Sequence, residues 1–558
     1  MNPERNVEDV PDDEASIEAA PLIHQAENET VVPPGQGQPN RRLGLVSTTF
    51  LITNRMIGTA IFSVPSAIAH STGSAGASLV VWVAGYFLAF CGFFIYLELG
   101  SLLPHNGGEK IYLEAAYPRP PLFATVIFAT HIIFLGFTGI GTIAIAENIL
   151  LATQATADDR TKRCMAVAFV ASVAAMHICA KTWNVKLMNI LASLKLFVLA
   201  LMVLTGLGLV IFGSPNIPYP GASYKHPFAG SSTDVADYTV ALFKVLATFQ
   251  GWSNAMYVLD EVKDPRRTLK VAGFLGVGSV GVLYVLLNAA FFVAATPKEL
   301  SETGITVVAL FVGKVCGQHM QRFTAILAAL SSLGNIMTAS FSMSRVIRSF
   351  AQEGLLPFSR FFASRSRSGS PAGAFALVFF SSCVMIIAVP FGEAYNFVLD
   401  VGQWAVALIQ FFVVCGLFII RKRVTYPPRA FKVWTSVACL FLATQVFLIV
   451  SPFVAPVTGR TSIPVWLTPL TGTLLLCLGG IYWYIWWILL PRLGQFSWEK
   501  NEIRRGPYRN RVDHDCLICD QYSCTTYNIG PNEKSHIESS EWIVRCSPLI
   551  VVTLHQNF

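Results

Sequence analysis

Long apolar runs recur along the whole chain, and they restrict its fold more than any other feature of the sequence. An apolar run of about 20 residues is long enough to cross the hydrocarbon core of a bilayer as an α-helix. Twelve such runs lie at about 43–69, 77–103, 122–154, 164–180, 187–213, 239–260, 271–296, 322–349, 372–391, 394–420, 431–452 and 463–490. The sequence therefore predicts an all-α polytopic membrane protein with twelve transmembrane helices.

The composition agrees with this fold class. Only 13% of the 558 residues are charged and 53% are hydrophobic, whereas about a quarter of a soluble protein is charged. The twelve cysteines lie mostly inside apolar runs, so we interpret them as small core residues and not as a disulfide framework. The chain lacks the phosphate-binding pattern G-x-x-x-x-G-K-[ST], and no cluster of reactive residues suggests an enzyme. We expect neither enzymatic activity nor nucleic-acid binding.

Basic residues predict the orientation. With the N-terminus in the cytoplasm, the inner loops carry twenty Lys and Arg residues and the outer loops eight, as the positive-inside rule requires. Both termini are then cytoplasmic. Residues 1–40 contain nine acidic residues and one basic residue, and we expect a disordered acidic cytoplasmic tail there. Residues 41–490 form the transmembrane domain, and residues 491–558 form a cytoplasmic C-terminal tail.

The first apolar run is interrupted by MIGTAIFSVP, from Met56 to Pro65. Glycine weakens a helix by about 1 kcal/mol relative to alanine, and proline removes a hydrogen-bond donor. A broken membrane helix is tolerated where the loosened backbone lines a cavity, and its free N–H groups then bind an anionic group. The alternative is a face of small residues that packs against another helix.

The sixth run contains a second interruption. Its middle carries Gln250, Gly251, Ser253 and Asn254 around Trp252. Polar residues at this depth cost several kcal/mol unless they face a cavity or find partners. In a five-plus-five inverted repeat, the sixth span is the counterpart of the first. Paired interruptions therefore predict a small-molecule site halfway across the membrane.

Four motifs around these breaks are similar to those of a known family. The segment GTAIF at 58–62 is similar to G-[ST]-G-I-F, and FQGW at 249–252 precedes DEVKDPRRTL at 260–269. The other two are YLELGSLLPHNGGEKIYLEAAY and SRVIRSFAQEGLLP. Over residues 43–490 the chain resembles the amino acid–polyamine–organocation (APC) superfamily, in particular its L-type amino acid transporter branch and the fungal high-affinity methionine permeases.

The resemblance implies a LeuT-like five-plus-five inverted repeat with broken helices 1 and 6 and two extra C-terminal helices. It also implies a permease that imports a neutral L-amino acid, with methionine favoured, across the plasma membrane by proton-coupled alternating access. An amino-acid exchanger or a nutrient-sensing transceptor is the alternative. Ala60 and Gln250 stand where the family usually has glycine, which disfavours bulky aromatic substrates. Paired broken helices favour a carrier over a channel.

For a zwitterionic substrate we expect the backbone N–H groups from Thr59 to Ile61 to bind the carboxylate. Carbonyls near Met56, Ile57 and Phe249 would accept hydrogen bonds from the ammonium group. The predicted substrate-binding residues are Ile57, Gly58, Thr59, Ala60, Ile61, Phe249, Gln250, Gly251, Trp252 and Asn254.

The aromatic residues of this set have two interpretations. Phe249 or Trp252 could form an outer gate, and the alternative is that they pack between helices or against lipid. Gln250 and Asn254 would shape the pocket for the substrate's side chain.

Lys195 lies about 12 Å inside the fifth span, at 1.5 Å per residue, where a buried ammonium group is expensive. The resemblance implies that it replaces the sodium ion that bridges helices 1 and 8 in other members, and that it exchanges a proton during transport. The alternative is a lysine that snorkels to the inner face. Glu147 is a second candidate for proton coupling or a solvated vestibule residue, and Lys244 is either a partner for it or an exposed residue.

Arg55 precedes the first break. It could pair with Glu98 or Glu261 as an inner gate, and the alternative is an ordinary charge at a helix end.

We expect the chain to bind its amino-acid substrate, protons and the lipid bilayer, without a cofactor. L-type animal members bind a single-span glycoprotein through a cysteine after the third span; the loop from Thr153 to Arg163 has none, so no covalent subunit is expected. Lys500 and Lys534 are candidate modification sites where ubiquitin-ligase adaptors would act on the tails. The C-terminal tail contains a pattern that resembles part of a zinc site, but a fourth ligand at the proper spacing is missing. The residues of this pattern are His514, Cys516, Cys519 and Cys524.

Overall fold

The computed structural model describes residues 41–494 with short gaps, and residues 498–500 and 522–524. The gaps are 137, 216, 218, 304–306, 367, 392, 424–430, 455–463 and 465. The predicted acidic tail at 1–40 and most of the predicted C-terminal tail lie outside the described residues.

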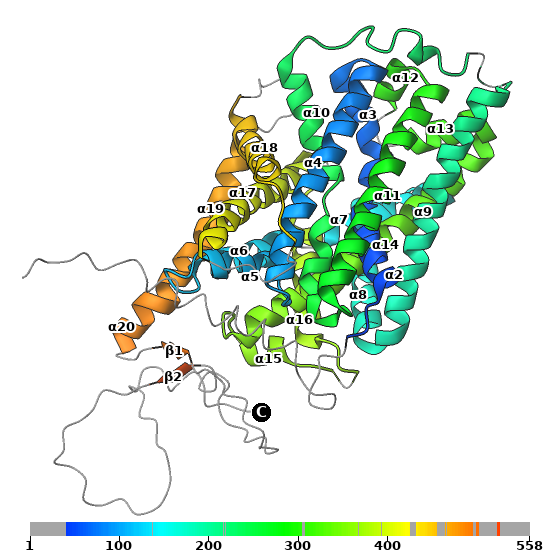
Figure 1. The fold of residues 1–558 in the computed structure, drawn as a ribbon. Coiled ribbons are helices and arrows are strands. Elements are labelled where there is room, and N and C mark those ends of the chain that lie inside the picture. The colour runs from blue at the N-terminus through cyan, green and yellow to red at the C-terminus, as the bar shows by residue number, and fades with distance from the viewer. Residues whose placement is uncertain are drawn as a thin grey trace, which may run out of the picture.

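Helices form nearly all of the described structure (Figure 1). In the first half of the chain they are α2 (Leu45–Met56), α3 (Ala60–Thr72), α4 (Ala75–Leu102), α5 (Glu109–Ala116), α6 (Phe123–Leu135), α7 (Gly139–Thr153), α8 (Asp159–Cys179), α9 (Lys181–Phe212), η2 (Ala222–Tyr224), α10 (Val235–Thr248) and η3 (Trp252–Glu261). The second half contains α11 (Pro265–Ala294), α12 (Pro297–Glu302), α13 (Val307–Cys316), α14 (Gln318–Gln352), α15 (Ser359–Ala363), α16 (Ala372–Ala388), α17 (Glu393–Arg423), α18 (Thr435–Val454), α19 (Leu467–Tyr484), η5 (Ile485–Leu489) and α20 (Leu490–Gly494).

The helices confirm an all-helical polytopic membrane protein. Nine stretches of the described chain are long and apolar enough to cross a bilayer, and the bent pair α2 and α3 makes ten. Each of the twelve predicted runs contains at least one helix. The helices α10, η3 and α16 are each too short to be counted as a membrane span by themselves. Beyond the helices, β1 (Trp498–Lys500) pairs antiparallel with β2 (Tyr522–Cys524).

The third predicted span is broken, which the sequence pattern did not show. The helix α6 ends at Leu135, Gly136 follows it, and α7 begins at Gly139. The backbone N–H of Thr138, between the two helices, donates to Oγ of Ser382 in α16 at 3.0 Å. A side chain of another helix therefore satisfies a backbone donor that the break leaves free, as burial in a membrane protein requires.

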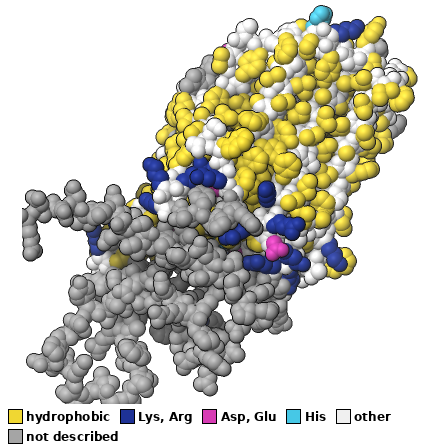
Figure 2. Space-filling view, viewed as in Figure 1, with side chains coloured by type: hydrophobic (Ala, Val, Ile, Leu, Met, Phe, Trp, Pro, Cys, Tyr) yellow, Lys and Arg dark blue, Asp and Glu magenta, His cyan; other side chains and the backbone are white. Residues whose placement is uncertain are grey.

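The broken helices lie inside the bundle. The helix α2 packs against α9, α11 and α14, and η3 packs against α2, α4 and α14. Figure 2 shows hydrophobic side chains over most of the visible helical surface, with Lys and Arg side chains gathered towards the end where α15 lies in Figure 1. An apolar belt with a basic end is the surface expected of a protein that crosses a membrane.

A buried ion pair joins α4 to α17 near the ends of these helices. Glu98 is fully buried, and Arg421 donates to both of its carboxylate oxygens, from Nε at 2.8 Å and from Nη2 at 2.6 Å. The backbone N–H of Val433 donates to the same carboxylate at 2.6 Å. The carboxylate is thus paired with a charge and well hydrogen-bonded, which offsets the cost of its burial.

Replacing Glu98 with alanine should destabilise the protein strongly, because it leaves the Arg421 guanidinium buried without its counter-charge. Breaking a buried pair in this way costs about 3–5 kcal/mol. We expect Glu98→Ala to lower the apparent melting temperature of the detergent-purified protein clearly. Glu302→Ala, at an exposed position, is the control and should change it little. Equal melting temperatures for the two variants would contradict a stabilising role of the Glu98–Arg421 ion pair.

Candidate functional site

The break between α2 and α3 bends the first span by 45°. Five consecutive carbonyls, from Asn54 to Gly58, accept hydrogen bonds from groups outside a regular helix. In lipid, an unsatisfied carbonyl costs several kcal/mol. The surrounding helices therefore stabilise this break with specific donors.

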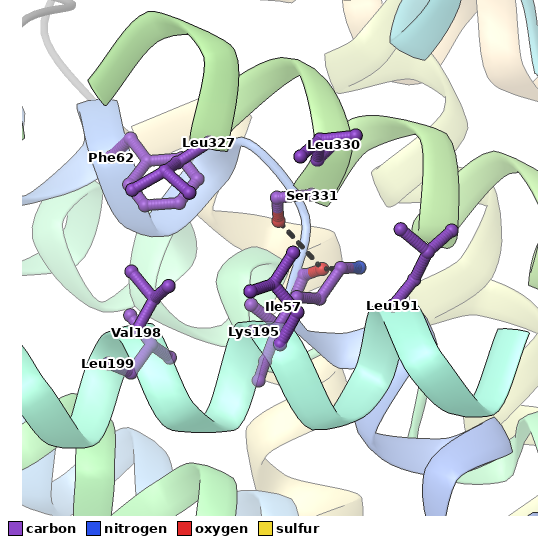
Figure 3. Close-up of a pocket in the computed structure, with 10 residues that line it drawn as sticks. Ile57, Phe62, Leu191, Lys195, Val198, Leu199, Leu327, Leu330 and Ser331 are labelled. Carbon is purple, nitrogen blue, oxygen red and sulfur yellow. Dashed lines mark hydrogen bonds between the residues drawn. The ribbon is translucent and has the colours of Figure 1, made fainter. Parts of the chain in front are cut away.

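Lys195 of α9 supplies the charged donor. Its Nζ donates to the carbonyl of Asn54 at 3.0 Å and to that of Ile57 at 2.6 Å. The side chain is 5% exposed. Figure 3 shows Lys195 beneath the link between α2 and α3, with Ser331 of α14 on the opposite side of Ile57. The ammonium group is therefore anchored at the break, and the alternative of a snorkelling lysine does not describe this structure.

Neutral side chains complete the set of donors. Asn335 Nδ2 donates to the carbonyl of Arg55 at 2.6 Å, and Tyr284 Oη donates to that of Met56 at 3.0 Å. Ser331 Oγ donates to the carbonyl of Gly58 at 3.2 Å. Sequence reasoning missed all three residues. The signal for two of them was the four-residue spacing of Ser331 and Asn335, which places them on one face of α14.

The sixth span breaks where predicted, between α10 and η3. Gly251 has a φ of 119°, which side chains rarely tolerate. A Cβ atom on Gly251 would lie 2.8 Å from Cγ and 2.9 Å from the backbone carbon of Arg55. The two breaks thus touch, and glycine is required at this contact both for its backbone conformation and for the lack of a side chain.

A cavity of about 320 Å³ lies between the two breaks, within the range of about 300–1,000 Å³ typical of small-molecule sites. Residues of α6, α7, α14 and α17 complete its wall. Among its polar lining residues are Arg55, Thr59, Glu109, His131, Gln250, Asn254, Asn335, Gln403 and Gln410. Nδ2 of Asn254 and Nδ1 of His131 are buried without a hydrogen-bond partner in the described structure.

The predicted binding residues fall into two groups. Those that line the cavity are Gly58, Thr59, Ala60, Gln250, Gly251 and Asn254. Ile57 and Ile61 are fully buried, and the carbonyl of Ile57 is occupied by Lys195.

The two predicted gate aromatics pack away from the cavity wall in this conformation. The ring of Phe249 contacts Trp82 and Tyr284, with ring centroids 6.0 Å and 5.3 Å away. The ring of Trp252 packs edge-on to Tyr96, 4.8 Å between centroids. This arrangement corresponds to the packing alternative, and gating by either ring stays a prediction.

Neither candidate ion pair of Arg55 forms in this structure. Arg55 pairs with neither Glu98, which binds Arg421, nor Glu261, which binds Arg345 at 2.9 Å. Its Nη1 donates to Oδ1 of Asn335 at 3.2 Å instead.

Lys244 of α10 is neither paired with Glu147 nor exposed. It interacts electrostatically with Asp400 of α17. Glu147, its predicted partner, has an exposed side chain and does not line the cavity. The role of Glu147 in proton coupling stays a prediction.

Glu109 of α5 is a buried carboxyl group that sequence reasoning did not single out. It lines the cavity and lies near the hydroxyl groups of Tyr257 and Tyr96, while its Oε2 has no hydrogen-bond partner among the described residues. Burial raises the pKa of Glu109 to about 7. The carboxyl group therefore exchanges its proton near neutral pH.

The described residues contain no group of three or more His, Cys, Asp or Glu side chains placed to hold a metal ion. Of the cysteines and histidine that hinted at zinc, only Cys524 lies within the described residues, in β2.

A helical membrane protein with two broken helices around a cavity has the architecture of a solute transporter. A family model described as "Amino acid permease" matches residues 43–476. The chain is 32% identical over 475 residues to a high-affinity methionine permease of Saccharomyces cerevisiae, covering 84% of this chain and 82% of the relative. It is 28% identical over 494 residues to a low-affinity methionine permease of the same yeast, with 86% and 88% covered. It is 24% identical over 423 residues to human b(0,+)-type amino acid transporter 1, with 75% and 84% covered. The chain belongs to the amino acid permease family, and it is a permease and not an enzyme.

The contact between the two breaks predicts a strong effect of a small substitution. We expect Gly251→Ala to abolish uptake, because the new Cβ would collide with the backbone of Arg55 at a φ that alanine disfavours. Gly208→Ala is the matched control, since no atom lies within 4 Å of the added Cβ. The uptake of radiolabelled amino acid by the two variants and the wild type is compared at equal surface expression. Normal uptake by Gly251→Ala would show that the helices need not touch here.

The raised pKa of Glu109 predicts a pH-dependent stability. An unfolded glutamate has a pKa of 4.5 and the folded one about 7. The folded state therefore binds this proton more tightly, so its stabilising contribution is present below the unfolded pKa and is lost as pH rises through about 7. As the pH rises from 4.5 to about 7, the apparent melting temperature of Glu109→Gln should fall less than that of the wild type. If the melting temperatures of the two proteins changed in parallel with pH, the raised pKa of Glu109 would be refuted. Glu302→Gln, at an exposed position, is the control.

Proposed function

We propose that the protein is a secondary active transporter that imports a neutral L-amino acid, with methionine favoured, across the plasma membrane by proton-coupled alternating access. The observation that carries the proposal is the cavity of about 320 Å³ between the broken spans. The high-affinity and low-affinity methionine permeases among its relatives support methionine as the substrate.

The proposal includes twelve transmembrane helices, a five-plus-five inverted repeat and cytoplasmic termini. Helices in all twelve apolar runs support the count, although nine or ten stretches of the described residues are long and apolar enough to cross a bilayer. Breaks in the first and sixth spans support the repeat, because the two spans occupy equivalent places in its halves. The basic end of the molecule supports the orientation (Figure 2).

The start of α3 would bind the substrate's carboxylate. The first N–H groups of a helix have no intrahelical acceptor, and the helix dipole places partial positive charge there. Thr59 and Ala60 occupy this position on the cavity wall. A carboxylate is the natural ligand of such a site.

The carbonyls near the breaks would bind the substrate's ammonium group. A carbonyl oxygen accepts two hydrogen bonds. The carbonyl of Ile57 already accepts from Lys195 at 2.6 Å and from Ser331 at 3.5 Å, so it is fully used. That of Met56 accepts from Tyr284 at 3.0 Å and from the backbone N–H of Gly58 at 3.1 Å, so it is fully used as well. Of the three carbonyls expected to bind the ammonium group, that of Phe249 would therefore be the acceptor in this conformation.

Lys195 would couple transport to protons. Its ammonium group is the cation that holds the carbonyls of Asn54 and Ile57 at the break. Loss of a proton would weaken both charge-assisted hydrogen bonds and loosen the link between α2 and α9. A second cavity of about 20 Å³ adjoins Lys195 (Figure 3). It has room for about one water molecule, which could carry the proton.

Uptake of a radiolabelled amino-acid panel in a permease-deficient host tests the function. We expect saturable uptake of methionine that an uncoupler stops, because proton symport requires the proton gradient. Uptake that persists with the uncoupler but requires internal amino acid would identify an exchanger. Surface-expressed protein that takes up none of the panel would refute amino-acid import.

Substitution of Lys195 tests the coupling. Lys195→Ala removes a buried cation and two hydrogen bonds, and we expect it to reduce proton-coupled uptake at least tenfold, which corresponds to about 1.4 kcal/mol. Lys186→Ala on the same helix is the control, since Lys186 is exposed. Full pH-dependent uptake by Lys195→Ala would reject the role.

A further inference from the structure

Arg55 is a cation in the cavity wall that has no counter-charge. One hydrogen bond, from Nη1 to Oδ1 of Asn335 at 3.2 Å, holds the guanidinium group. In the described part of the chain, no carboxylate oxygen lies within 4.0 Å of it. Since arginine keeps its charge at any physiological pH, this side chain is a permanent positive charge in the cavity.

The position of Arg55 places this charge beside the proposed substrate site. Its Cγ lies 2.8 Å from where a Cβ of Gly251 would be, so the aliphatic part of the side chain lies between the two breaks. Gly58 and Thr59 line the same cavity three and four residues later. Lys195 adds a second positive charge from behind the first break, where the two cations interact.

Negative charge in the cavity is weak by comparison. Within the described lining, Arg55 is the only Lys or Arg, Glu109 is the only carboxylic acid, and His131 is the only histidine. The pKa of Glu109 is about 7 because the group is buried, so near neutral pH it is ionised only part of the time. Tyr257 interacts with both Arg55 and Glu109. The cavity is therefore positive on balance, most strongly at the breaks.

We propose that Arg55 determines charge specificity, by excluding amino acids with cationic side chains from a site that admits neutral ones. This inference rests on the transport function proposed above. Two unit charges about 8 Å apart in a partly buried site repel by an amount that weakens binding roughly 30-fold, or about 2 kcal/mol. A neutral side chain of equal length experiences no such repulsion. The filter is an unfavourable interaction with the wrong ligand, which is a common source of specificity.

Lysine and norleucine test the proposal, because their side chains are similar in length and differ in the terminal ammonium group. Each competes with radiolabelled methionine for uptake, and the ratio of their inhibition constants measures the filter. In the wild type we expect lysine to compete roughly 30-fold more weakly than norleucine, at acidic and at neutral pH alike. Arg55→Gln should reduce the ratio about tenfold or more, and Arg55→Lys should retain it.

Two further variants separate Arg55 from its neighbours. Glu109→Gln should not reduce the ratio, because it removes no positive charge. Asn335→Asp places a carboxylate against the Arg55 guanidinium and should reduce the ratio as Arg55→Gln does. If Arg55→Gln does not reach the cell surface, Asn335→Asp tests the role of the Arg55 charge in its place. If Arg55 acts only by repelling cationic side chains, its loss leaves the binding of a neutral amino acid intact. A folded Arg55→Gln protein that norleucine no longer stabilises in a thermal-shift assay would therefore overturn the proposal.

The outcomes distinguish this inference from the function on which it rests. Methionine uptake that lysine and norleucine inhibit equally would overturn the filter and leave the transporter intact. An unchanged ratio in active Arg55→Gln, or a ratio lost in Arg55→Lys, would also overturn it. Absence of any amino-acid uptake by surface-expressed wild type would overturn the transport function, and the filter with it.

Discussion

The satisfaction of five loose carbonyls inside the membrane is the constraint on which the rest of the site depends. Lipid offers no hydrogen bond to an unwound backbone, so every carbonyl from Asn54 to Gly58 needs a donor from a neighbouring helix. The donors come from α9, α11 and α14, and the strongest is the ammonium group of Lys195. These helices hold the break open, and the open break gives the cavity its wall.

The sequence revealed the breaks because their residues are unusual for a membrane span. Glycine, threonine and proline around Gly58, and amides around Gly251, stand out in apolar runs. Lys195 stood out for the same reason, since a charge so deep is expensive. The partners did not stand out. Asn335 lies in a run rich in serine and threonine, so nothing local marked it as the residue that holds Arg55.

The wrong pairings share a physical cause. Glu98, Glu261 and Arg55 are all near helix ends or breaks in the sequence, and opposite charges there suggested ion pairs. Partner choice depends on which helices are neighbours in space, and the acidic groups found arginines more than 80 residues away along the chain. The break between α6 and α7 was not predicted although Gly136, Thr138 and Gly139 lie there, because glycine also occurs inside unbroken spans such as α11; the helix ends and the contact of Thr138 with α16 reveal it.

Contact between the two breaks links their movements. The backbone of Arg55 lies so close to Gly251 that neither broken helix can move towards the other there. Their other ends are joined as well, because Leu43 and Glu261 are linked by a backbone hydrogen bond of 2.8 Å. Both breaks are tied to α14 through side chains: Arg345 binds Glu261 of η3, and Ser331 and Asn335 donate to the carbonyls of Gly58 and Arg55. These side-chain interactions can break without unfolding a helix. A change in the side to which the cavity opens would therefore move α2 and η3 together against α14.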